Sequence, residues 1–146
     1  MLFICTISVF NRYGKQLLDE MLQPHSLDWR DLVAILVLEQ IPGASQSRLI
    51  PFLQTDKANI TKILKALESK GLINRQIDQT DKRNRACSLT EQGQNLAPKL
   101  YNVLQEWEAI CFQGIPEAEV EQYKATSEKI TKIMMADQSF NEREGQ

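Results

Sequence analysis

The stretch Asp56-Lys-Ala-Asn-Ile-Thr-Lys-Ile-Leu-Lys-Ala-Leu-Glu-Ser-Lys-Gly71 carries the signals that decide the fold. Asp56 can cap the free amides of a first helical turn, and Gly71 can take the left-handed conformation that ends a helix. The sequence therefore predicts one helix over residues 57–70. Apolar residues at helical spacing predict its buried stripe, which consists of Ile60, Ile63, Leu64 and Leu67.

The residues off this stripe are cations, small residues and amides, namely Lys57, Ala58, Asn59, Thr61, Lys62 and Lys65. Such a face suits a DNA major groove, where lysine meets phosphate or guanine and asparagine pairs with adenine. A solvated helix face has a similar composition, so this helix alone does not decide between the two interpretations.

The residues after this helix predict a β-hairpin. Residues 72–78 alternate as a strand does, residues 79–83 form a polar loop, and residues 84–89 can return as the partner strand. Upstream, Ser45 or Ser47 can cap a short helix. A helix, a turn, a second helix and a hairpin in this order predict a winged helix-turn-helix.

The tip of the predicted hairpin, or wing, is basic. Arg83 and Arg85, with Lys82 beside them, can reach a minor groove or the flanking phosphates, and Asp81 would hold an arginine in place. We expect DNA contacts from the helix face, the wing and two flanking residues, namely Ser47, Lys57, Ala58, Asn59, Thr61, Lys62, Lys65, Arg75, Lys82, Arg83 and Arg85.

Three motifs in this region occur in a specific order and spacing. They are Glu68-Ser-Lys-Gly-Leu-Ile-Asn-Arg75, Asp78-Gln-Thr-Asp-Lys-Arg83 and Ser88-Leu-Thr-Glu-Gln-Gly93. Together they resemble the signature of the MarR family of bacterial transcription regulators. The resemblance covers most of the chain, but only residues 45–93 carry distinctive motifs.

The resemblance implies roles for individual residues. Residues 57–65 would form the recognition helix, with Ala58, Asn59 and Lys62 at positions that often approach bases. Asp81 and Arg83 match the family's wing aspartate and arginine. The family often has arginine where Lys62 stands, and lysine offers a mobile point charge instead of a planar fork.

The charge of the chain is divided unevenly along its 146 residues. Residues 45–90 contain nine Lys or Arg and four Asp or Glu, a net charge of +5, whereas the remainder contains eight and fifteen, a net charge of −7. A basic module in an acidic scaffold is expected if one face meets DNA. The composition, with 42% hydrophobic and 25% charged residues, is that of a soluble globular domain.

We expect a single domain over residues 1–146, mainly α with a small β-hairpin wing. Residues 27–93 would form the winged helix-turn-helix, residues 1–25 and 94–137 a helical dimerisation region, and residues 138–146 a frayed tail. Predicted helix boundaries outside the basic region are a cap at Ser26, a cap at Thr90, a kink at Pro98, and a first helical position at Pro116.

Three helical segments show apolar seams. The residues are Phe3, Ile7, Phe10, Gly14, Leu17 and Met21 in the first, Leu96, Leu100, Val103, Trp107 and Ile110 in the fifth, and Val120, Tyr123, Ser127, Ile130 and Met134 in the last. Packing within the chain is one interpretation. A homodimer is favoured, because symmetric DNA readers need a device that sets the spacing of their two recognition helices.

Neither a catalytic nor a metal site is indicated. There is no Gly-rich phosphate loop or nucleophile elbow, and the single histidine, His25, has no obvious partner in the sequence. Cys5, Cys87 and Cys111 are scattered without a CxxC motif, which suits a reducing cytoplasm. No segment is long and apolar enough to span a membrane. We expect a cytoplasmic protein that is not an enzyme and needs no cofactor.

The resemblance also suggests how the protein is regulated. MarR-like proteins are commonly switched by small aromatic or anionic ligands, and some by cysteine oxidation. Tyr13, His25 and Trp29 are candidates for an effector pocket near the junction of the first two helices. We expect Cys5 to be buried and inert, and Cys87 to be the better candidate sensor because Arg85 lies on its strand face.

The sequence therefore favours a sequence-specific regulator that binds double-stranded DNA, acting as a ligand-responsive repressor and as a homodimer on a palindromic operator. Two alternatives stay open: a redox-sensing regulator of the same fold, and a winged-helix module that binds protein instead of DNA.

Overall fold

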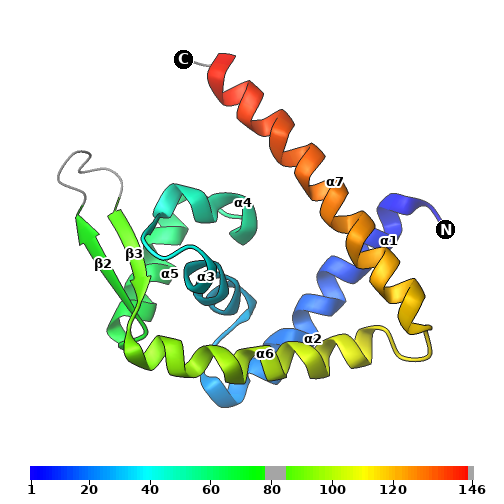
Figure 1. The fold of residues 1–146 in the computed structure, drawn as a ribbon, viewed down its shortest axis with the longest axis horizontal. Coiled ribbons are helices and arrows are strands. Elements are labelled where there is room, and N and C mark those ends of the chain that lie inside the picture. The colour runs from blue at the N-terminus through cyan, green and yellow to red at the C-terminus, as the bar shows by residue number, and fades with distance from the viewer. Residues whose placement is uncertain (78–84, 145–146) are drawn as a thin grey trace. The chain divides into compact units, whose positions relative to one another are not determined.

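The computed structural model describes the backbone of residues 1–77 and 85–144, and the side chains of residues 1–76 and 86–136. Its elements are α1 (Phe3–Val9), the π-helix η1 (Phe10–Gly14), α2 (Lys15–Leu22), the 3-10 helix η2 (Gln23–His25), α3 (Trp29–Gln40), β1 (Ala44–Ser45), the 3-10 helix η3 (Gln46–Leu49), α4 (Ile50–Leu53), α5 (Lys57–Ser69), β2 (Ile73–Ile77), β3 (Arg85–Leu89), α6 (Glu91–Cys111) and α7 (Glu117–Glu144). The chain divides into two compact units, residues 1–108 and 109–146. This mainly helical fold with one small antiparallel sheet confirms the predicted fold class (Figure 1).

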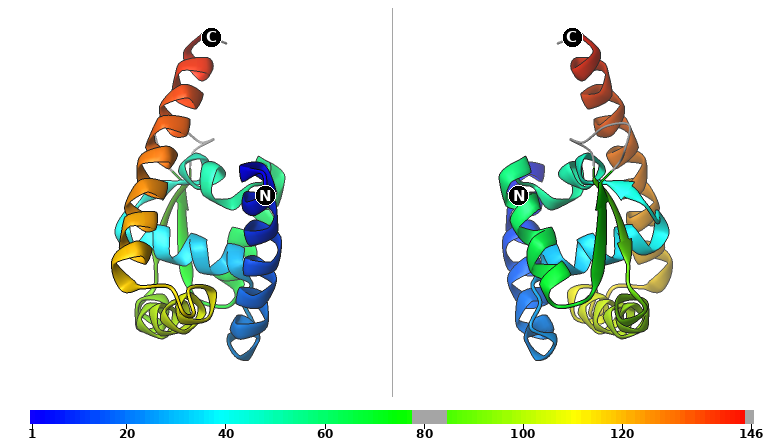
Figure 2. Two further views of the ribbon diagram at one scale, coloured as in Figure 1. Left: turned by 90° about the vertical axis from the view of Figure 1, so that its right-hand side faces the viewer. Right: turned by 90° about the vertical axis from the view of Figure 1, so that its left-hand side faces the viewer.

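The core of the first unit is built around α3. Its buried residues are Leu32, Ala34, Ile35 and Leu38. α3 contacts α2 on one side and β3 on the other, and it runs between the N-terminal helices and the sheet (Figure 1, Figure 2). The dense apolar run in this segment correctly predicts a central core helix.

The helix α3 starts at a different cap from the predicted one. The Asp28 carboxylate accepts a hydrogen bond from the Asp31 amide at 2.9 Å, and the Asp31 carboxylate accepts one from the Asp28 amide at 3.0 Å. This reciprocal pair is a capping box. Ser26 was the expected cap, but it lies in the left-handed region with φ of +56°, where it ends η2. The chain needs two further residues to turn before α3 begins.

The N-terminal segment is one continuous run of helix, interrupted by the π-helical turn η1. A π-turn inserts an extra residue and changes which backbone groups pair. Here the Gly14 carbonyl accepts a hydrogen bond from the Trp107 indole nitrogen at 2.8 Å. The rings of Trp107 and Phe10 also pack together, with centroids 5.9 Å apart. α6 therefore holds the middle of this segment.

The sheet has three strands in the order β1-β3-β2, all antiparallel. The hairpin is the predicted one, and its register pairs Ile73 with Leu89 and Arg75 with Cys87. The short strand β1 was not predicted, because two residues are too few to show alternation. It pairs Ala44 with Cys87 and so attaches the end of α3 to the hairpin.

Ser45, one of the two expected caps, is the residue before the short helix that precedes α5, but its side chain makes no capping hydrogen bond. Ser45 has an extended backbone, and a 3-10 turn (η3) follows it before α4. Pro51 consequently falls in the first turn of α4, where proline is tolerated. The 3-10 turn thus allows the helical segment to begin directly after Ser45 while Pro51 stays in the first turn of α4.

The helix α6 is capped by Thr90, as predicted. The Thr90 hydroxyl accepts a hydrogen bond from the Gly93 amide at 3.1 Å and donates one to the Gly71 carbonyl at 2.5 Å. The Thr90 amide donates to the Leu72 carbonyl at 3.0 Å. These bonds fix the first turn of α6 against the chain that leaves α5. α6 continues through Pro98 to Cys111.

The apolar seam of α6 packs mostly within the first unit, in contrast to its expected role in dimerisation. Leu100 is fully buried, while Leu96, Val103 and Trp107 are half-buried against the core. Ile110 is the exposed member of the seam. Trp107 contacts Gly14 and Phe10 of the N-terminal segment, so part of this seam packs within the unit.

The second unit contains the end of α6 and α7. Gly114, with φ of +79°, ends the first of these helices. Pro116 lies one residue before α7, not at its first position, and its carbonyl accepts the Val120 amide at 3.1 Å. The Phe112 and Tyr123 rings meet edge to face at 5.9 Å. In the described parts of the chain, no helix has the length and apolarity needed to cross a membrane.

Candidate DNA-binding surface and effector cavity

The helix α5 has the cap and the stop that the sequence predicts. The Asp56 carboxylate accepts a hydrogen bond from the Asn59 backbone amide at 2.9 Å. Gly71 lies beyond the other end with φ of +73°. The observed helix, Lys57–Ser69, ends one residue before the predicted one. The N-terminal turn is therefore fixed by a carboxylate and presents its side chains from a defined position.

One face of α5 is buried and the other is open. Ile60, Leu64 and Leu67 are buried, and Ile63 is half-buried, which confirms the predicted stripe. Five of the six outward candidates are exposed, namely Lys57, Ala58, Asn59, Lys62 and Lys65. Their cations, amide and small side chain are available to a groove of DNA.

The sixth candidate, Thr61, is half-buried and engaged in local hydrogen bonds. Its hydroxyl donates to the Lys57 carbonyl at 3.0 Å and accepts from the Gln46 amide nitrogen at 3.3 Å. Thr61 thus ties α5 to η3. The exposed Asn59 also has a local bond, because its side-chain nitrogen donates to the Thr55 hydroxyl at 2.9 Å. That bond holds the amide near the start of the helix.

Arg75 does not lie on the outer surface, where it was expected to contact DNA. Its side chain is only 5% exposed, and its guanidinium faces back toward the helices. Nη2 lies 3.3 Å from a Glu68 carboxylate oxygen, and Nη1 donates to the Gln46 side-chain carbonyl at 3.4 Å. The guanidinium is thus engaged by Glu68 and Gln46, in contrast to the outer position expected for a phosphate contact.

Ser47 and the wing complete the candidate set. Ser47 is exposed in η3, with its hydroxyl 2.9 Å from that of Ser45. Asp81, Lys82 and Arg83 lie outside the described residues. Arg85 is the first residue of β3, and its side chain is outside the described set. The wing contacts therefore stay a prediction.

The structure contains a winged helix-turn-helix, which consists of the helices η3, α4 and α5 followed by the β2–β3 hairpin. The sequence of this part of the chain matches the model of a known family. Residues 27–84 match the model of the MarR family. In this part of the chain the sequence is thus similar to the MarR family.

Solved structures share this MarR fold over most of their length. A crystal structure of MarR has a TM-score of 0.86 and 22% identity, with 95% of each chain covered. A MarR transcriptional regulator from Methanosarcina mazei Go1 has a TM-score of 0.81 and 24% identity, covering 90% of this chain and 94% of its own. A cysteine-to-serine mutant of MarR from E. coli, complexed with operator DNA, has a TM-score of 0.72 and 21% identity, covering 86% and 90%.

The MarR fold does not bring the three effector candidates into one pocket. Trp29 lines a cavity beside α2, and His25 lines a separate cleft beside α6. Tyr13 lines neither and is exposed, with the Arg12 guanidinium over its ring at 5.5 Å. Nearness in sequence did not bring them together, because the bend at η2 turns the chain between His25 and Trp29.

The cavity beside Trp29 has a volume of about 430 Å³ and is mainly apolar. Its lining includes Leu18, Leu32, Leu36, Leu104 and Trp107, with Asn11, Lys15, Gln40 and Gln54 as polar groups. The Lys15 ammonium sits 3.7 Å from the centre of the Trp29 ring, and the Arg30 guanidinium lies over the same ring at 4.8 Å. The lining therefore combines an indole with a cation, as an aromatic anion would require.

Lys15 connects this cavity to the helix-turn-helix. Its ammonium donates a hydrogen bond to the Gln54 side-chain carbonyl at 2.5 Å, and Gln54 ends α4 with φ of +52°. Desolvation lowers the pKa of Lys15, the Arg30 charge lowers it further, and Asp19 partly opposes them. An anion in the cavity would relieve the excess positive charge there.

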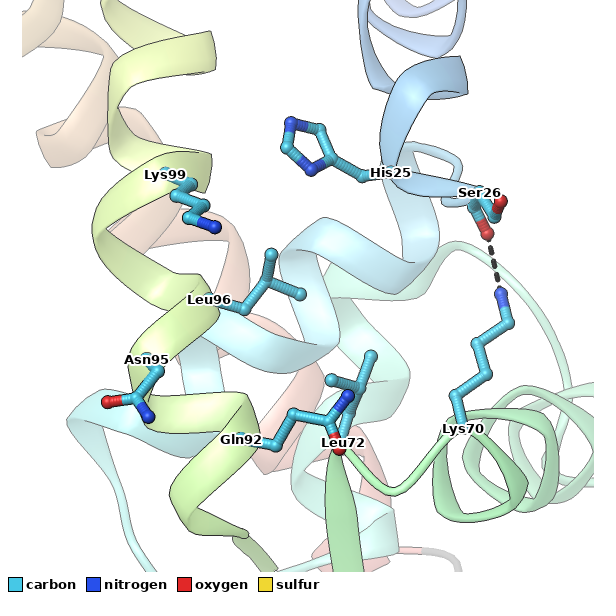
Figure 3. Close-up of a pocket in the computed structure, with 8 residues that line it drawn as sticks. All are labelled: His25, Ser26, Lys70, Leu72, Gln92, Asn95, Leu96 and Lys99. Carbon is cyan, nitrogen blue, oxygen red and sulfur yellow. Dashed lines mark hydrogen bonds between the residues drawn. The ribbon is translucent and has the colours of Figure 1, made fainter.

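The cleft beside His25 has a volume of about 580 Å³. Figure 3 shows the His25 ring pointing toward α6, which presents Gln92, Asn95, Leu96 and Lys99 to the cleft. The Lys70 ammonium donates to the Ser26 carbonyl at 2.5 Å (Figure 3). This bond joins the residues that follow α5 and η2, and both of them line the cleft.

The cysteines differ from expectation in their burial. Cys5 was expected to be buried, but it is exposed on α1, none of whose residues is buried. Cys87, the better candidate sensor, is fully buried in the sheet. Oxidants reach exposed thiolates, so the burial of Cys87 opposes a sensing role in this folded state.

Four residues of these sites carry no signal in the sequence, namely Lys15, Gln46, Gln54 and Glu68. Three of them act through partners that are distant in the chain, in the pairs of Lys15 with Gln54 and of Gln46 with Arg75. A polar residue beside an apolar stripe gives no local signal of such a bond. Glu68 lies in the first of the three sequence motifs, but its ion pair with Arg75 depends on the packing of the hairpin against α5.

Proposed function

We propose that this protein is a transcription repressor that binds double-stranded DNA sequence-specifically, as a homodimer on a palindromic operator, and that a small ligand controls its release. The observation that carries the DNA-binding part is the exposed face of α5, with three lysines and Asn59 beside a capped N-terminus. A structural neighbour, the E. coli MarR mutant, was solved with operator DNA, which supports this proposal.

The exposed face of α5 suits the major groove. Lys57 and Asn59 project from the first turn, which is the part of a recognition helix that usually reaches base edges. Lys62 and Lys65 follow about one and two turns later on the open face and can neutralise phosphates. The wing cations, Arg83 and Arg85, would add contacts beside the groove.

A homodimer explains the apolar surface that the chain leaves open. Phe3, Ile4 and Ile7 are exposed on α1, and Ile130, Ile133 and Met134 are exposed on α7. Burial of apolar area contributes about 25 cal/mol per Å², so two copies that cover these residues gain stability. Two-fold symmetry would place the two α5 helices on the half-sites of a palindrome.

Binding to duplex DNA at several salt concentrations tests the proposal directly. Phosphate contacts release counterions, so the logarithm of affinity should fall linearly with the logarithm of salt concentration, by about 0.9 per contact. A duplex selected by the protein from a random library should bind more tightly than random DNA. Absence of both effects would favour a module that binds protein.

Replacing Asn59 by alanine should reduce affinity for the selected operator by about 1 to 3 kcal/mol and leave random DNA nearly unaffected, because a base contact is lost. Competition titrations with the two duplexes measure the difference. Asn95→Ala is the matched control, since Asn95 is an exposed amide on α6. Equal losses on both duplexes for Asn59→Ala would contradict base reading by this residue.

The cavity beside Trp29 is the proposed ligand site. A small aromatic carboxylate would stack on the apolar lining and place its charge near Lys15. To do so it competes with Gln54 for the Lys15 ammonium, and Gln54 belongs to the turn that leads into α5. A ligand that prefers the changed turn shifts the protein toward the state that releases DNA.

Replacing Lys15 by methionine should weaken benzoate binding at least about tenfold, because the stem is kept and the charge is lost. Tryptophan fluorescence can follow the titration, since Trp29 and Trp107 both line the cavity. Benzoate affinity of the unaltered protein should also fall at alkaline pH. The ammonium form binds the anion, and the lowered pKa of Lys15 brings its deprotonation to a lower pH than for an ordinary lysine.

Two controls define this experiment. Benzamide has the same ring without the charge, so its binding should be insensitive to Lys15→Met. Lys99→Met removes a lysine from the other cleft and should leave benzoate binding unchanged. If Lys99→Met and Lys15→Met weaken benzoate binding equally, the ligand does not occupy the cavity beside Trp29.

A further inference from the structure

Arg75 lies in the middle of β2, in register with Cys87 of β3. Its side chain is 5% exposed, although arginine rarely leaves water unless its charge is paired. The guanidinium is thus enclosed at the junction of the hairpin and the two helices of the helix-turn-helix.

The partners of Arg75 come from both of these helices. Nη2 is paired with the Glu68 carboxylate of α5 at 3.3 Å, and Nη1 donates to the Gln46 side-chain carbonyl of η3 at 3.4 Å. The Gln46 amide nitrogen in turn donates to the Thr61 hydroxyl of α5. One side chain of the hairpin therefore contacts the recognition helix directly and again through Gln46.

The third nitrogen of the guanidinium, Nε, is buried without a hydrogen-bond partner. A buried donor left unsatisfied is costly, so a residue that only stabilised the fold would be expected to satisfy all its donors or to be apolar. Arg75 instead directs both of its terminal nitrogens toward the helices. This arrangement fixes the position of the hairpin relative to α5 and η3, at the cost of one unsatisfied donor.

We propose that Arg75 is a positioning residue that sets the angle of α5 against the wing, and so determines operator discrimination without touching DNA. This inference rests on the proposed function. The recognition helix and the wing must reach neighbouring grooves at the same time, so their relative position decides whether base contacts form. We call Arg75 and its two partners, Glu68 and Gln46, the clamp.

The salt dependence of binding separates positioning from a phosphate contact. Arg75→Met keeps the stem and removes the charge. A lost phosphate contact would lower affinity for operator and random DNA alike and reduce the salt slope by about 0.9. A lost clamp should reduce the ratio of operator to random affinity at least about tenfold, and leave the salt slope on random DNA unchanged.

Glu68→Ala provides a second variant, which is expected to fold because Glu68 is partly exposed. Removing an acidic group near DNA would by electrostatics alone tighten binding to every duplex. The clamp requires instead that operator discrimination falls, and that Arg75→Met combined with Glu68→Ala loses little more than either variant. Asn74→Ala, on the exposed face of the same strand, is the control and should keep full discrimination.

Hydrogen exchange of the DNA-free protein tests the clamp separately from the proposed function. Both Arg75→Met and Glu68→Ala should speed amide exchange in α5 and in β2 while α3 keeps its protection. Unchanged exchange in α5, or unchanged operator discrimination in both variants, would overturn the inference. If the unaltered protein failed to discriminate any duplex, the exchange result would still decide whether the clamp exists, and the proposed function alone would be rejected.

Discussion

Replacing Gly93 by alanine is expected to destabilise the first unit by roughly 3 kcal/mol or more. A Cβ at this position would lie 2.2 Å from the Leu72 carbonyl oxygen and 3.2 Å from its carbon. Both are backbone atoms, so neither can move without displacing the chain that joins α5 to the hairpin. Chemical denaturation followed by circular dichroism measures the loss of unfolding free energy.

Gly14→Ala is the matched control, because Gly14 is also a buried helical glycine. Its added Cβ would meet the Trp107 and Phe10 rings at 3.4 and 3.5 Å, which is ordinary contact. Alanine also favours helix, so the net change should stay within about 1 kcal/mol. Similar losses for the two variants would show that the approach of α6 to Leu72 is not the cause.

Replacing Ile133 by aspartate is expected to convert a dimer into a monomer and to weaken operator binding at least about 100-fold. A monomer contacts one half-site only and loses the gain in affinity from two linked contacts. Ile133 is 59% exposed on α7 and belongs to the open apolar surface. A charge in the centre of an interface leaves an unpaired buried group. Sedimentation should change from twice the 16.7 kDa chain mass to that mass.

Lys132→Asp introduces the same carboxylate one residue earlier, where the side chain is 74% exposed and paired with Glu128. Charged positions of this kind are depleted from interface cores, so this variant should remain dimeric. A monomer for the unaltered protein, still binding a palindrome tightly, would contradict the proposed assembly.

The central part of the fold could be predicted because its signals are local. Asp56 and Gly71 mark the two ends of α5 by interactions within one turn of the helix, so both ends can be recognised from the residue types alone. The alternation of β2 is equally local, and its pairing with β3 follows from the short connection. The Ser26 cap was wrong because two neighbouring polar residues offer competing caps, and the left-handed turn at Ser26 decides between them.

The site was less predictable, because burial and partners depend on the whole fold. Arg75 was read as a surface cation, whereas the packing of β2 against α5 encloses it. Cys5 was read as buried because its neighbours are apolar, but no residue of α1 is buried. The cavity beside Trp29 is lined from several separate segments, which no single stretch of sequence reveals.

The short strand β1 affects the order in which the protein can be made. Ala44 pairs with Cys87, so the end of α3 finds its sheet partner only after 43 further residues, including the whole of α5, have been synthesised. Contacts between residues so far apart form late and slow folding. Until β3 leaves the ribosome, β1 and β2 lack the central strand that pairs with both of them. A nascent chain that stops before Arg85 would therefore expose the side of α3 that packs against β3, where chaperones would be expected to bind.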